Sequence, residues 1–440
     1  MASRGEHLVR ADRRFVTGVG WLGRLTAPLF ARVLDDLDAR LALGGLEATL
    51  PDGDKRRIGF RAPGPVAVVR LHSWMALVRL ATSGSVGWYK AWAAREWSSP
   101  DPVPLFELFM ANAVSLGDTA RAKGPMRVLN ALAHRLRDNG LAQARDNIAA
   151  HYDLGNDFYA AWLDSTMSYS SARFQTEPFV PSEVERPSRQ RVSTSLDTNG
   201  VGKAELAEAQ QRKIALLLDR LDIRPGTCLL EIGCGWGSLA IEAAKRGATV
   251  TALTLSAEQK GWAQAKIADA GLSDRVEVLL QDYRLVTNAY DAIASVEMVE
   301  AVGERWWPAY LDTVARSLVP GGRAALQFIA IDHRLFDAYS ASADFIQAYI
   351  FPGGMLIDEP RFEALAAARG LGWDDRDGFG LDYAETLRQW RIRYDDAVRA
   401  GRLDEFSAEF HNLWRYYLMY CEGGFRGRGI DVAQITLTKS

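Results

Sequence analysis

Three glycines stand at alternate positions in "LLEIGCGWGS", directly after an apolar run and directly before a segment with helical spacing. They are Gly233, Gly235 and Gly237. Glycines between a buried strand and a helix let the backbone approach a ligand closely, at the end of the helix that carries partial positive charge. The segment therefore predicts a ligand-binding loop.

A nicotinamide dinucleotide is one ligand for such a loop, but the neighbouring residues do not favour it. The dinucleotide fingerprint places its third glycine one position later, where Ser238 stands. It also requires an acidic side chain at the end of the second strand. That strand ends in "TALTLSAEQ", with Thr254, Ser256 and Gln259 but no carboxylate before Glu258. We therefore expect a different cofactor.

The elements that must position this loop alternate between helix and strand. A helix is expected over 204–221, strands in "TCLLEIG", "TVTALTL", "VEVLLQD" and "YDAIASVE", and helices in "SLAIEAAKRG" and around 257–270. This alternation predicts a parallel, doubly wound α/β sheet. An amphipathic helix near 404–421 and a final strand, "DVAQITLTK", follow it.

The segment 1–115 has a different character. Three strand-like runs, "LEATLP", "RRIGFRA" and "VAVVRLH", have a turn at Asp52-Gly53 between the first two. Helical stretches rich in large apolar residues follow. Four tryptophans in this part, either lining a lipid-sized cavity or forming ordinary core, are Trp74, Trp88, Trp92 and Trp97. Residues 175–203 are polar, contain three prolines and predict a long loop.

Composition limits the functional classes. The 440 residues include 52 basic and 55 acidic side chains, net −3, which gives no basic excess for binding nucleic acid. Cys228, Cys234 and Cys421 are far apart and suggest a reducing, cytoplasmic compartment, with Cys228 inside a buried strand. The spacing of the histidines indicates no metal site.

The N-terminus is locally basic. Residues 1–32 carry six arginines against Glu6 and Asp12, and apolar residues recur with helical spacing from Leu22 to Leu37. A basic amphipathic helix can lie on anionic lipid, but it can equally pack on its own domain. Both interpretations stay open at this point. The first implies peripheral attachment to the inner face of the membrane.

Beyond the loop, eight ordered segments resemble one family. They are "HYDLGNDFYAAWLDSTMSYSS", "EIGCGWGSLA", "LTLSAEQ", "LLQDYR", "SVEMVEAVG", "YIFPGGML", "GFGLDYAETLRQW" and "YYLMYCEGGFRGRGIDVAQITL". Together they resemble the cyclopropane-fatty-acid synthases, strongly over 145–440 and more weakly over 40–115. The resemblance implies a class I S-adenosylmethionine-dependent methyltransferase (Rossmann-like) domain over 151–440. A smaller α+β lipid-binding domain over 1–115 and a helical connection over 116–150 are expected to precede it.

The resemblance also implies a cofactor, S-adenosylmethionine, and a substrate, the cis double bond of an unsaturated phospholipid acyl chain. Tyr169 and Ser170 match the pair that contacts the carboxylate end of the cofactor, and Asp282 stands where the adenine is reached. The residues expected to hold the cofactor are Tyr169, Ser170, Gly233, Gly235, Gly237, Thr254, Ser256, Gln259, Asp282 and Tyr283. A homodimer stays open.

Catalysis in this family begins with attack of the π electrons on the sulfonium methyl group, which leaves a carbocation. A bicarbonate ion then removes a proton from the delivered methyl group, and the ring closes. The family holds this ion with a cysteine, a glutamate, a histidine and a tyrosine. The corresponding residues here are Ser171, Glu300 (followed by Ala301), Gln327 and Tyr383, and Cys421 matches a cysteine near the C-terminus.

Two of these four positions therefore differ from the family pattern. Ser171 and Gln327 can still form hydrogen bonds, but the thiol and the titratable imidazole are absent. Glu300 is the expected protein base, with a pKa raised by an apolar pocket. Whether bicarbonate binds is left open.

Weaker removal of the methyl proton favours a hydride shift and a methyl-branched product. The alternatives are neutral substitutions in a ring-forming enzyme, a methyltransferase for a small acceptor, and a lipid-binding protein without catalysis. Aromatic faces that could stabilise the cation are those of Tyr349, Phe351, Tyr383, Trp414 and Tyr417.

Overall fold

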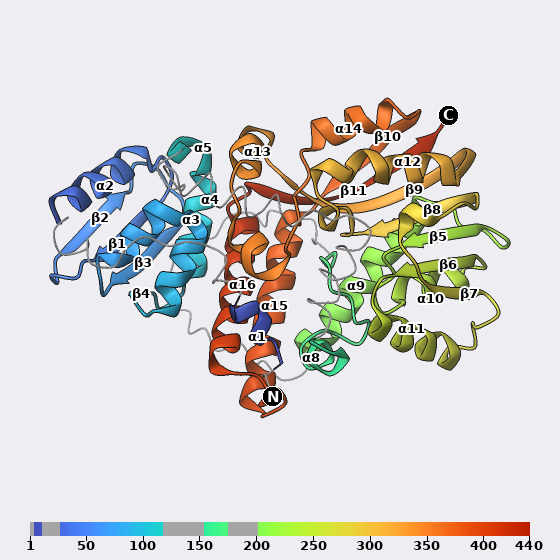
Figure 1. The fold of residues 1–440 in the computed structure, drawn as a ribbon, viewed down its shortest axis with the longest axis horizontal. Helices are drawn as coiled ribbons and strands as arrows, with labels where there is room; N and C mark the ends of the chain where they lie inside the picture. The colour runs from blue at the N-terminus through green and yellow to red at the C-terminus, as the bar shows by residue number, and fades with distance from the viewer. Residues whose placement is uncertain (1–3, 11–26, 118–153, 175–200) are drawn as a thin grey trace, which may run out of the picture.

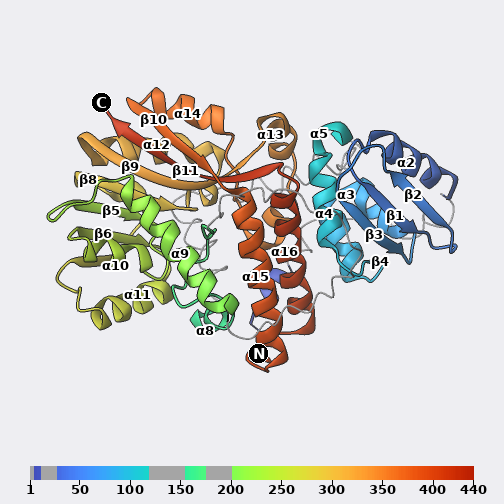
Figure 2. The same cartoon turned by 180° about the vertical axis from the view of Figure 1, so that it is seen from behind.

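The computed structural model describes residues 4–10, 27–117, 154–174 and 201–440. Three parts lie side by side: an N-terminal unit, a central pair of long helices, and a large sheet covered by helices (Figure 1). The view from behind shows the same order (Figure 2). The short α1 (Glu6–Val9) packs against the central pair.

The N-terminal unit is a four-stranded sheet with helices. The strand order is β2-β1-β3-β4, with β1 antiparallel to β2 and parallel to β3. Strand β3 alternates as the sequence predicts, because Ala67, Val69 and Leu71 are buried while Val66 and Val68 are exposed. Its elements are α2 (Ala27–Arg40), β1 (Gly45–Thr49), β2 (Lys55–Gly59), β3 (Val66–Leu71), α3 (Met75–Ala93), β4 (Trp97–Ser98), α4 (Val103–Ala111) and α5 (Ala113–Leu116).

The four tryptophans of this unit belong to its core. The rings of Trp88 and Trp97 stack with centroids 4.5 Å apart, and the Trp97 indole N–H donates to the Trp88 carbonyl at 3.0 Å. Trp74 and Trp92 pack against the same cluster. The core interpretation is therefore confirmed, and these rings do not line the large cavity described below.

The large sheet has seven strands in the order β10-β11-β9-β8-β5-β6-β7. The strands from β9 to β7 run parallel, and β11 lies antiparallel between β9 and β10. The bounds are β5 (Cys228–Ile232), β6 (Thr249–Thr254), β7 (Val276–Leu280), β8 (Tyr290–Val296), β9 (Leu318–Ile331), β10 (Leu371–Gly378) and β11 (Ile430–Lys439). The predicted doubly wound α/β sheet is confirmed.

Helices cover both faces of this sheet. In β5, Leu229 packs into one core cluster and Leu230 into the other, as expected because successive side chains of a strand point to opposite faces. One face is covered by α9 (Val201–Asp219), α10 (Ser238–Lys245) and α11 (Ala257–Asp269). The other is covered by α12 (Trp307–Ser317) and α14 (Glu359–Ala367).

Two long helices, α15 (Gly380–Arg399) and α16 (Ala408–Arg426), pack together between the sheet and the N-terminal unit (Figures 1 and 2). Helix α16 approaches α4 closely through glycines. A Cβ atom at Gly423 would lie 2.4 Å from Phe106 Cβ, and one at Gly427 would lie 2.6 Å from Met110 Cβ. The two glycines therefore let α4 approach the C-terminal helix closely.

Shorter elements complete the part of the chain that carries the large sheet. They are α8 (Asn156–Ala160), η4 (Tyr283–Leu285), η5 (Val299–Ala301), η6 (Glu304–Trp306), α13 (His333–Ser340) and the π-helix η7 (Ile346–Ile350).

Some sequence expectations need correction or fall outside the described residues. Cys228 is exposed rather than buried, because it is the first residue of β5 and its side chain lies beyond the packed part of the sheet. Nearly all of the expected connection and loop, 118–150 and 175–200, lies outside the described residues. So do residues 1–3 and 11–26 of the basic segment 1–32. No helix in the described part is long and apolar enough to cross a membrane.

Candidate active site

A cavity of about 560 Å³ connects the three parts of the molecule. Its lining includes residues at the carboxyl ends of β5, β6 and β8, residues of α15 and α16, and residues of α4 and α5 in the N-terminal unit. Ligands of parallel α/β sheets bind at this edge of the strands. The cavity therefore lies where the glycine loop was expected to act.

The glycine loop forms one end of the cavity. Gly233, Gly235 and Gly237 have φ angles of 86°, 52° and 92°, which side chains other than glycine rarely adopt. A Cβ atom at Gly233 would meet Met298 at 2.9 Å, whereas at Gly235 the space is open. The loop thus forms a cradle that a side chain at residue 235 would fill, which fits the expected cofactor.

Two of the expected cofactor residues line the cavity at the end of the second strand: Thr254, the last residue of β6, and Gln259 in the first turn of α11. The Thr254 hydroxyl donates to Gln259 Oε1 at 2.9 Å. Ser256 accepts from the Gln259 N–H at 3.2 Å and so caps α11. Ser256 and Gly237 shape these loops without lining the cavity.

Asp282 and Tyr283 also line this end. Asp282 caps η4 by accepting from the Arg284 N–H at 2.9 Å, and its Oδ2 pairs with the Arg284 guanidinium at 2.7 Å. Both carboxylate oxygens are therefore held in place next to the position expected for the adenine.

A buried lysine that the sequence analysis missed faces Ser170. Lys213 Nζ donates to Ser170 Oγ at 2.7 Å, and both residues line the cavity. Burial lowers the pKa of Lys213 to about 8, and burial also raises the pKa of nearby Glu231 to about 8. An ammonium group therefore lies at the end where the cofactor carboxylate is expected.

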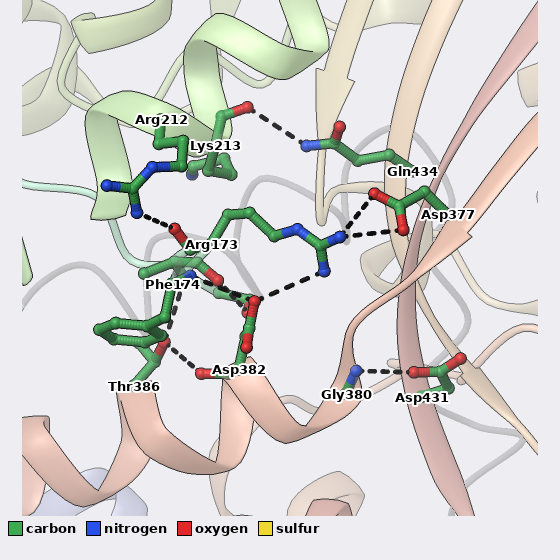
Figure 3. Close-up of polar contacts among 12 residues, drawn as sticks. Arg173, Phe174, Arg212, Lys213, Asp377, Gly380, Asp382, Thr386, Asp431 and Gln434 are labelled. Carbon is green, nitrogen blue, oxygen red and sulfur yellow. Dashed lines mark hydrogen bonds and ion pairs between the residues drawn. The ribbon is translucent and has the colours of Figure 1, made fainter. Parts of the chain in front are cut away.

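The segment that carries Tyr169, Ser170 and Ser171 is fixed by its next residues (Figure 3). The Arg173 guanidinium pairs with Asp377 at 2.9 Å and with Asp382 at 3.5 Å. The Phe174 N–H donates to the same Asp382 carboxylate at 3.1 Å. These contacts join the segment to β10 and to the first turn of α15, which also carries Tyr383.

The residues expected to hold an anion converge on the carboxylate of Glu297. The Ser171 N–H and the Gln327 side-chain amide donate to Glu297 Oε1 at 2.9 and 2.7 Å. The Tyr383 hydroxyl donates to Oε2 at 2.8 Å. The three donors therefore surround a carboxylate that belongs to the chain itself, and sequence reasoning missed it.

Glu297 has an unusual backbone. Its φ is 48°, in the left-handed region that side chains other than glycine rarely adopt, and its N–H donates to the Gln327 carbonyl at 2.7 Å. Burial raises the pKa of Glu297, and hydrogen bonds from Ser171, Gln327 and Tyr383 and the charge of Lys213 oppose this. A strained residue that holds a buried carboxylate is typical of a functional site.

Glu300, the expected base, lies three residues after Glu297, in η5, and also lines the cavity. Its Oε1 accepts from the Ile329 N–H, and its Oε2 has no hydrogen-bond partner among the described residues. Burial, together with the charge of Glu297, raises the pKa of Glu300 to about 8. The pKa is raised in the expected direction, which favours the protonated carboxyl.

Ser171 contributes in a different way from the one expected. Its hydroxyl donates to the Ala172 carbonyl at 3.0 Å, so the backbone N–H rather than the side chain contacts Glu297. The Gln327 amide donates to Glu297, but neither Gln327 nor Ser171 lines the cavity itself. Cys421 lines the cavity, and burial raises the pKa of its thiol well above the ordinary value, which keeps it neutral.

The remainder of the cavity is largely apolar. Its walls come from α4, α5, β9, α13, η7 and α16, and the side chains include Phe106, Phe109, Met110, Ala113, Leu116, Ile329, Leu335, Ile346 and Phe425. A long hydrocarbon chain suits such a wall. The N-terminal unit thus forms part of the same cavity as the cofactor loop.

Several expected aromatic faces are in place. Phe351, Tyr383 and Tyr417 line the cavity, and the Tyr417 hydroxyl lies 2.8 Å from that of Tyr169. Tyr349 and Trp414 are buried in the core and do not line it. Three of the five candidates can therefore face a cation in this cavity.

Residues 140–435 match the family model of the mycolic acid cyclopropane synthetases. The tuberculostearic acid methyltransferase UfaA1 of Mycobacterium tuberculosis is 38% identical over 373 residues, which cover 82% of this chain and 80% of that protein. The cyclopropane-fatty-acyl-phospholipid synthase of Escherichia coli is 33% identical over 290 residues, 66% of each chain.

Two solved structures share the fold, and nearly the whole of each of their chains aligns with this one. The cyclopropane synthase MmaA2 from Mycobacterium tuberculosis has a TM-score of 0.57 and 28% identity, and covers 67% of this chain and 98% of its own. The mycolic acid cyclopropane synthase CmaA1, complexed with SAH and CTAB, has a TM-score of 0.56 and 29% identity at the same coverage.

Proposed function

Because this chain belongs to the mycolic acid cyclopropane synthetase family, we propose that it methylates the cis double bond of unsaturated phospholipid acyl chains. It is an S-adenosylmethionine-dependent methyltransferase. The product that we propose is a methyl-branched chain without a cyclopropane ring.

The carboxylate of Glu297 carries this proposal. Ser171, Gln327 and Tyr383 are the positions at which the family holds a free anion, and all three donate to Glu297 here. Their hydrogen bonds are therefore already made, and a bicarbonate ion would have to displace a side chain. We propose that Glu297 takes the place of that ion.

The cavity arranges the reaction as follows. S-adenosylmethionine, when bound, supplies an electrophilic methyl group, and the π electrons of the acyl chain form the new C–C bond. The neighbouring chain carbon becomes a carbocation. Glu297 stabilises it by charge, and the faces of Phe351, Tyr383 and Tyr417 add to this.

The carbocation then loses a proton without closing a ring. A hydride moves from the methyl-bearing carbon to the cationic carbon, so the positive charge is now on the branched carbon. A carbon next to it loses a proton to Glu297, and the C–H electron pair forms a new double bond. The net change is the addition of one CH2 unit to the chain.

Hydrogen bonding favours this route over ring closure. Both oxygens of Glu297 accept hydrogen bonds, which stabilise its charged form and reduce its basicity. These hydrogen bonds oppose the effect of burial, which raises the pKa of Glu297. Because they occupy both carboxylate oxygens, the delivered methyl group is deprotonated more slowly and the cation can rearrange first. The similarity to a tuberculostearic acid methyltransferase supports the branched product.

Lipid analysis tests the proposal directly. The chain is expressed in a host rich in cis-monounsaturated phospholipid, and its acyl chains are analysed by gas chromatography and mass spectrometry. We expect chains heavier by one CH2 unit with a methyl or methylene branch. Cyclopropane chains would refute the branched product, and unchanged lipids would refute acyl methylation. The matched control is Glu297→Gln.

We further propose that the N-terminal unit binds lipid and that the protein acts at the membrane surface. The apolar wall from α4 and α5 supports the first part, and the exposed Val66 and Val68 on β3 support the second. Sedimentation with anionic vesicles should recover the protein, and recovery should fall as salt rises. Light scattering of the full chain tests the expected homodimer.

A further inference from the structure

Two buried glutamines form a hydrogen-bonded chain that leads to Glu297. Gln434 on β11 and Gln327 on β9 are directly opposite each other in the sheet. Gln434 Nε2 donates to Gln327 Oε1 at 3.0 Å, and Gln327 Nε2 donates to Glu297 Oε1 at 2.7 Å. The orientation of one amide therefore sets the orientation of the next.

The direction of this chain is determined by groups that can only accept or only donate. Gln434 Nε2 also donates to the Lys213 carbonyl at 3.3 Å (Figure 3), and Gln434 Oε1 accepts from Arg220 Nε at 3.4 Å. Gln327 Nε2 also donates to the Ser171 carbonyl at 3.4 Å. A carbonyl never donates and a guanidinium never accepts, so both amides have one allowed orientation.

Reversal of Gln327 would damage the site. Its carbonyl oxygen would then face Glu297, so a donor would be replaced by an acceptor beside a buried carboxylate. A buried charged group that loses a hydrogen bond is destabilised by more than the bond contributes when it is made. Gln434 opposes this reversal, because its own N–H2 group requires the Gln327 oxygen.

We propose that Gln434 is a positioning residue for methyl transfer, which holds Gln327 with its N–H2 group toward Glu297. Neither Gln434 nor Gln327 lines the cavity, and Gln434 reaches Glu297 through Gln327. The proposal rests on the role that the proposed function gives to Glu297.

The charged form of Glu297 makes this role measurable. The groups that face Glu297 are Lys213 from α9, Glu300 from η5 and Tyr383 from α15, besides Ser171 and Gln327. The Gln327 hydrogen bond lowers the pKa of Glu297. If Gln327 turns, this contribution is lost and the pKa rises, so the acid limb of the activity profile moves to higher pH.

The test compares Gln434→Leu, Gln434→Glu and the control Thr436→Val in the full chain. Thr436 is also buried, lies two residues along β11 on the same face, and its hydroxyl has no partner among the described residues. Total methyl transfer from labelled S-adenosylmethionine to phospholipid is measured across pH, whatever the product. Calorimetry gives cofactor affinity.

We expect kcat to fall about 10-fold in Gln434→Leu and about 100-fold in Gln434→Glu, whose carboxylate accepts from Gln327 and so reverses it. The acid limb should move up by about one pH unit. Cofactor affinity and the Thr436→Val activity should stay as in the unmodified protein. Unchanged activity in both Gln434 variants would overturn the proposal.

A double-mutant cycle separates positioning from packing. If Gln434 acts through Gln327, then Gln327→Leu with Gln434→Leu should be as active as Gln327→Leu alone. Additive losses, or a loss without a shift of the acid limb, would mean that Gln434 only supports the fold and would refute the proposal. A cyclopropane product would contradict the proposed function but leave this test intact, because total transfer is measured.

Discussion

At the scale of residues, two carboxyl groups three positions apart have different states. Glu297 accepts three hydrogen bonds that stabilise its charged form, whereas Glu300 accepts one and has a pKa of about 8. Environments that separate the pKa values of two neighbouring acids often assign them different roles. We therefore propose that Glu297, with three donors on its carboxylate, is the anion and that Glu300 acts as a protonated hydrogen-bonding group.

Glu297→Gln should abolish catalysis while cofactor binding remains. The substitution keeps size and removes the charge that faces the carbocation, so we expect kcat to fall about 100-fold or more. Glu300→Gln should cost less, because glutamine resembles a protonated carboxyl. Methyl transfer from labelled cofactor and calorimetry measure the two effects. Equal losses in both variants would contradict the division of roles.

Glu300 should also make stability depend on pH. Its pKa is raised from an ordinary value of 4.5 to about 8, so the folded protein holds this proton more tightly than the unfolded chain. The stability from this group is present below about pH 4.5 and is lost as pH rises through about 8. The Tm of Glu300→Gln, followed from pH 5 to pH 9, should fall less than that of the unmodified protein.

The control for this measurement is Glu277→Gln on the exposed side of β7. It should show the same pH slope as the unmodified protein. If the Tm of all three proteins changed equally with pH, Glu300 would not hold its proton in the folded state.

The sequence predicted Glu300 and not Glu297, for a physical reason. Family motifs identify positions, but the carboxylate that meets the donors is selected by backbone direction. Glu297 has a left-handed φ and its side chain lies against Ser171 and Gln327. The local sequence pattern does not predict this backbone conformation. The available signal was a second glutamate in the matched segment "SVEMVEAVG", directly after β8. Lys213 was missed because a single lysine in a helix usually lies at the surface.

At the scale of elements, the sequence predicted most strands and helices of the large sheet. β5, β6 and β8 are nearly continuous apolar runs bounded by turns, and their glycine loop follows the strand as expected. The packing of α4 on α16 was not predictable, since it joins segments more than three hundred residues apart. That contact places residues of α4 in the apolar wall of the cavity.

Gly427→Ala should displace α4 and damage the cavity. The new methyl group would lie 2.6 Å from Met110 Cβ and 2.7 Å from the Glu107 carbonyl, so the helices must separate. We expect a loss of about 1–3 kcal/mol in stability and lower transfer to long acyl chains. Chemical denaturation and lipid analysis measure these.

The control for Gly427→Ala is Gly261→Ala. Gly401→Ala is less suitable, because the φ of 70° at Gly401 would itself strain an alanine. A Cβ atom at Gly261, inside α11, would meet nothing within 4 Å. That variant should keep stability and activity. Normal stability in Gly427→Ala would contradict the close approach of α4 and α16.

At the scale of the molecule, the cofactor loop lies in the methyltransferase part, which shares the apolar wall of the cavity with the N-terminal unit. The two mycobacterial structures cover 98% of their own chains but 67% of this one, and the family model begins at residue 140. Those two proteins therefore form this fold without a counterpart of the N-terminal unit. In this protein, the N-terminal unit adds Phe106, Phe109 and Met110 to the cavity.

Removal of residues 1–117 should separate cofactor binding from methyl transfer to phospholipid. We expect residues 118–440 to fold and to bind S-adenosylmethionine with unchanged affinity, because the loop contacts lie in the retained part. Methyl transfer to phospholipid should fall at least about 10-fold, since one wall of the apolar cavity is lost. Calorimetry and lipid analysis provide the readouts. Full transfer by the shorter chain would refute a role of the N-terminal unit in the cavity.

The position of β11 has a consequence for biosynthesis. The last strand of the chain lies inside the sheet, between β9 and β10, and carries Gln434. During translation, β9 therefore presents an unpaired edge until β11 has left the ribosome, and exposed edges promote aggregation. The nascent protein can assemble its cofactor loop early, but Gln434 can contact Gln327 only after β11 has joined the sheet. Truncation of the final strand should therefore yield an insoluble chain rather than a partly active enzyme.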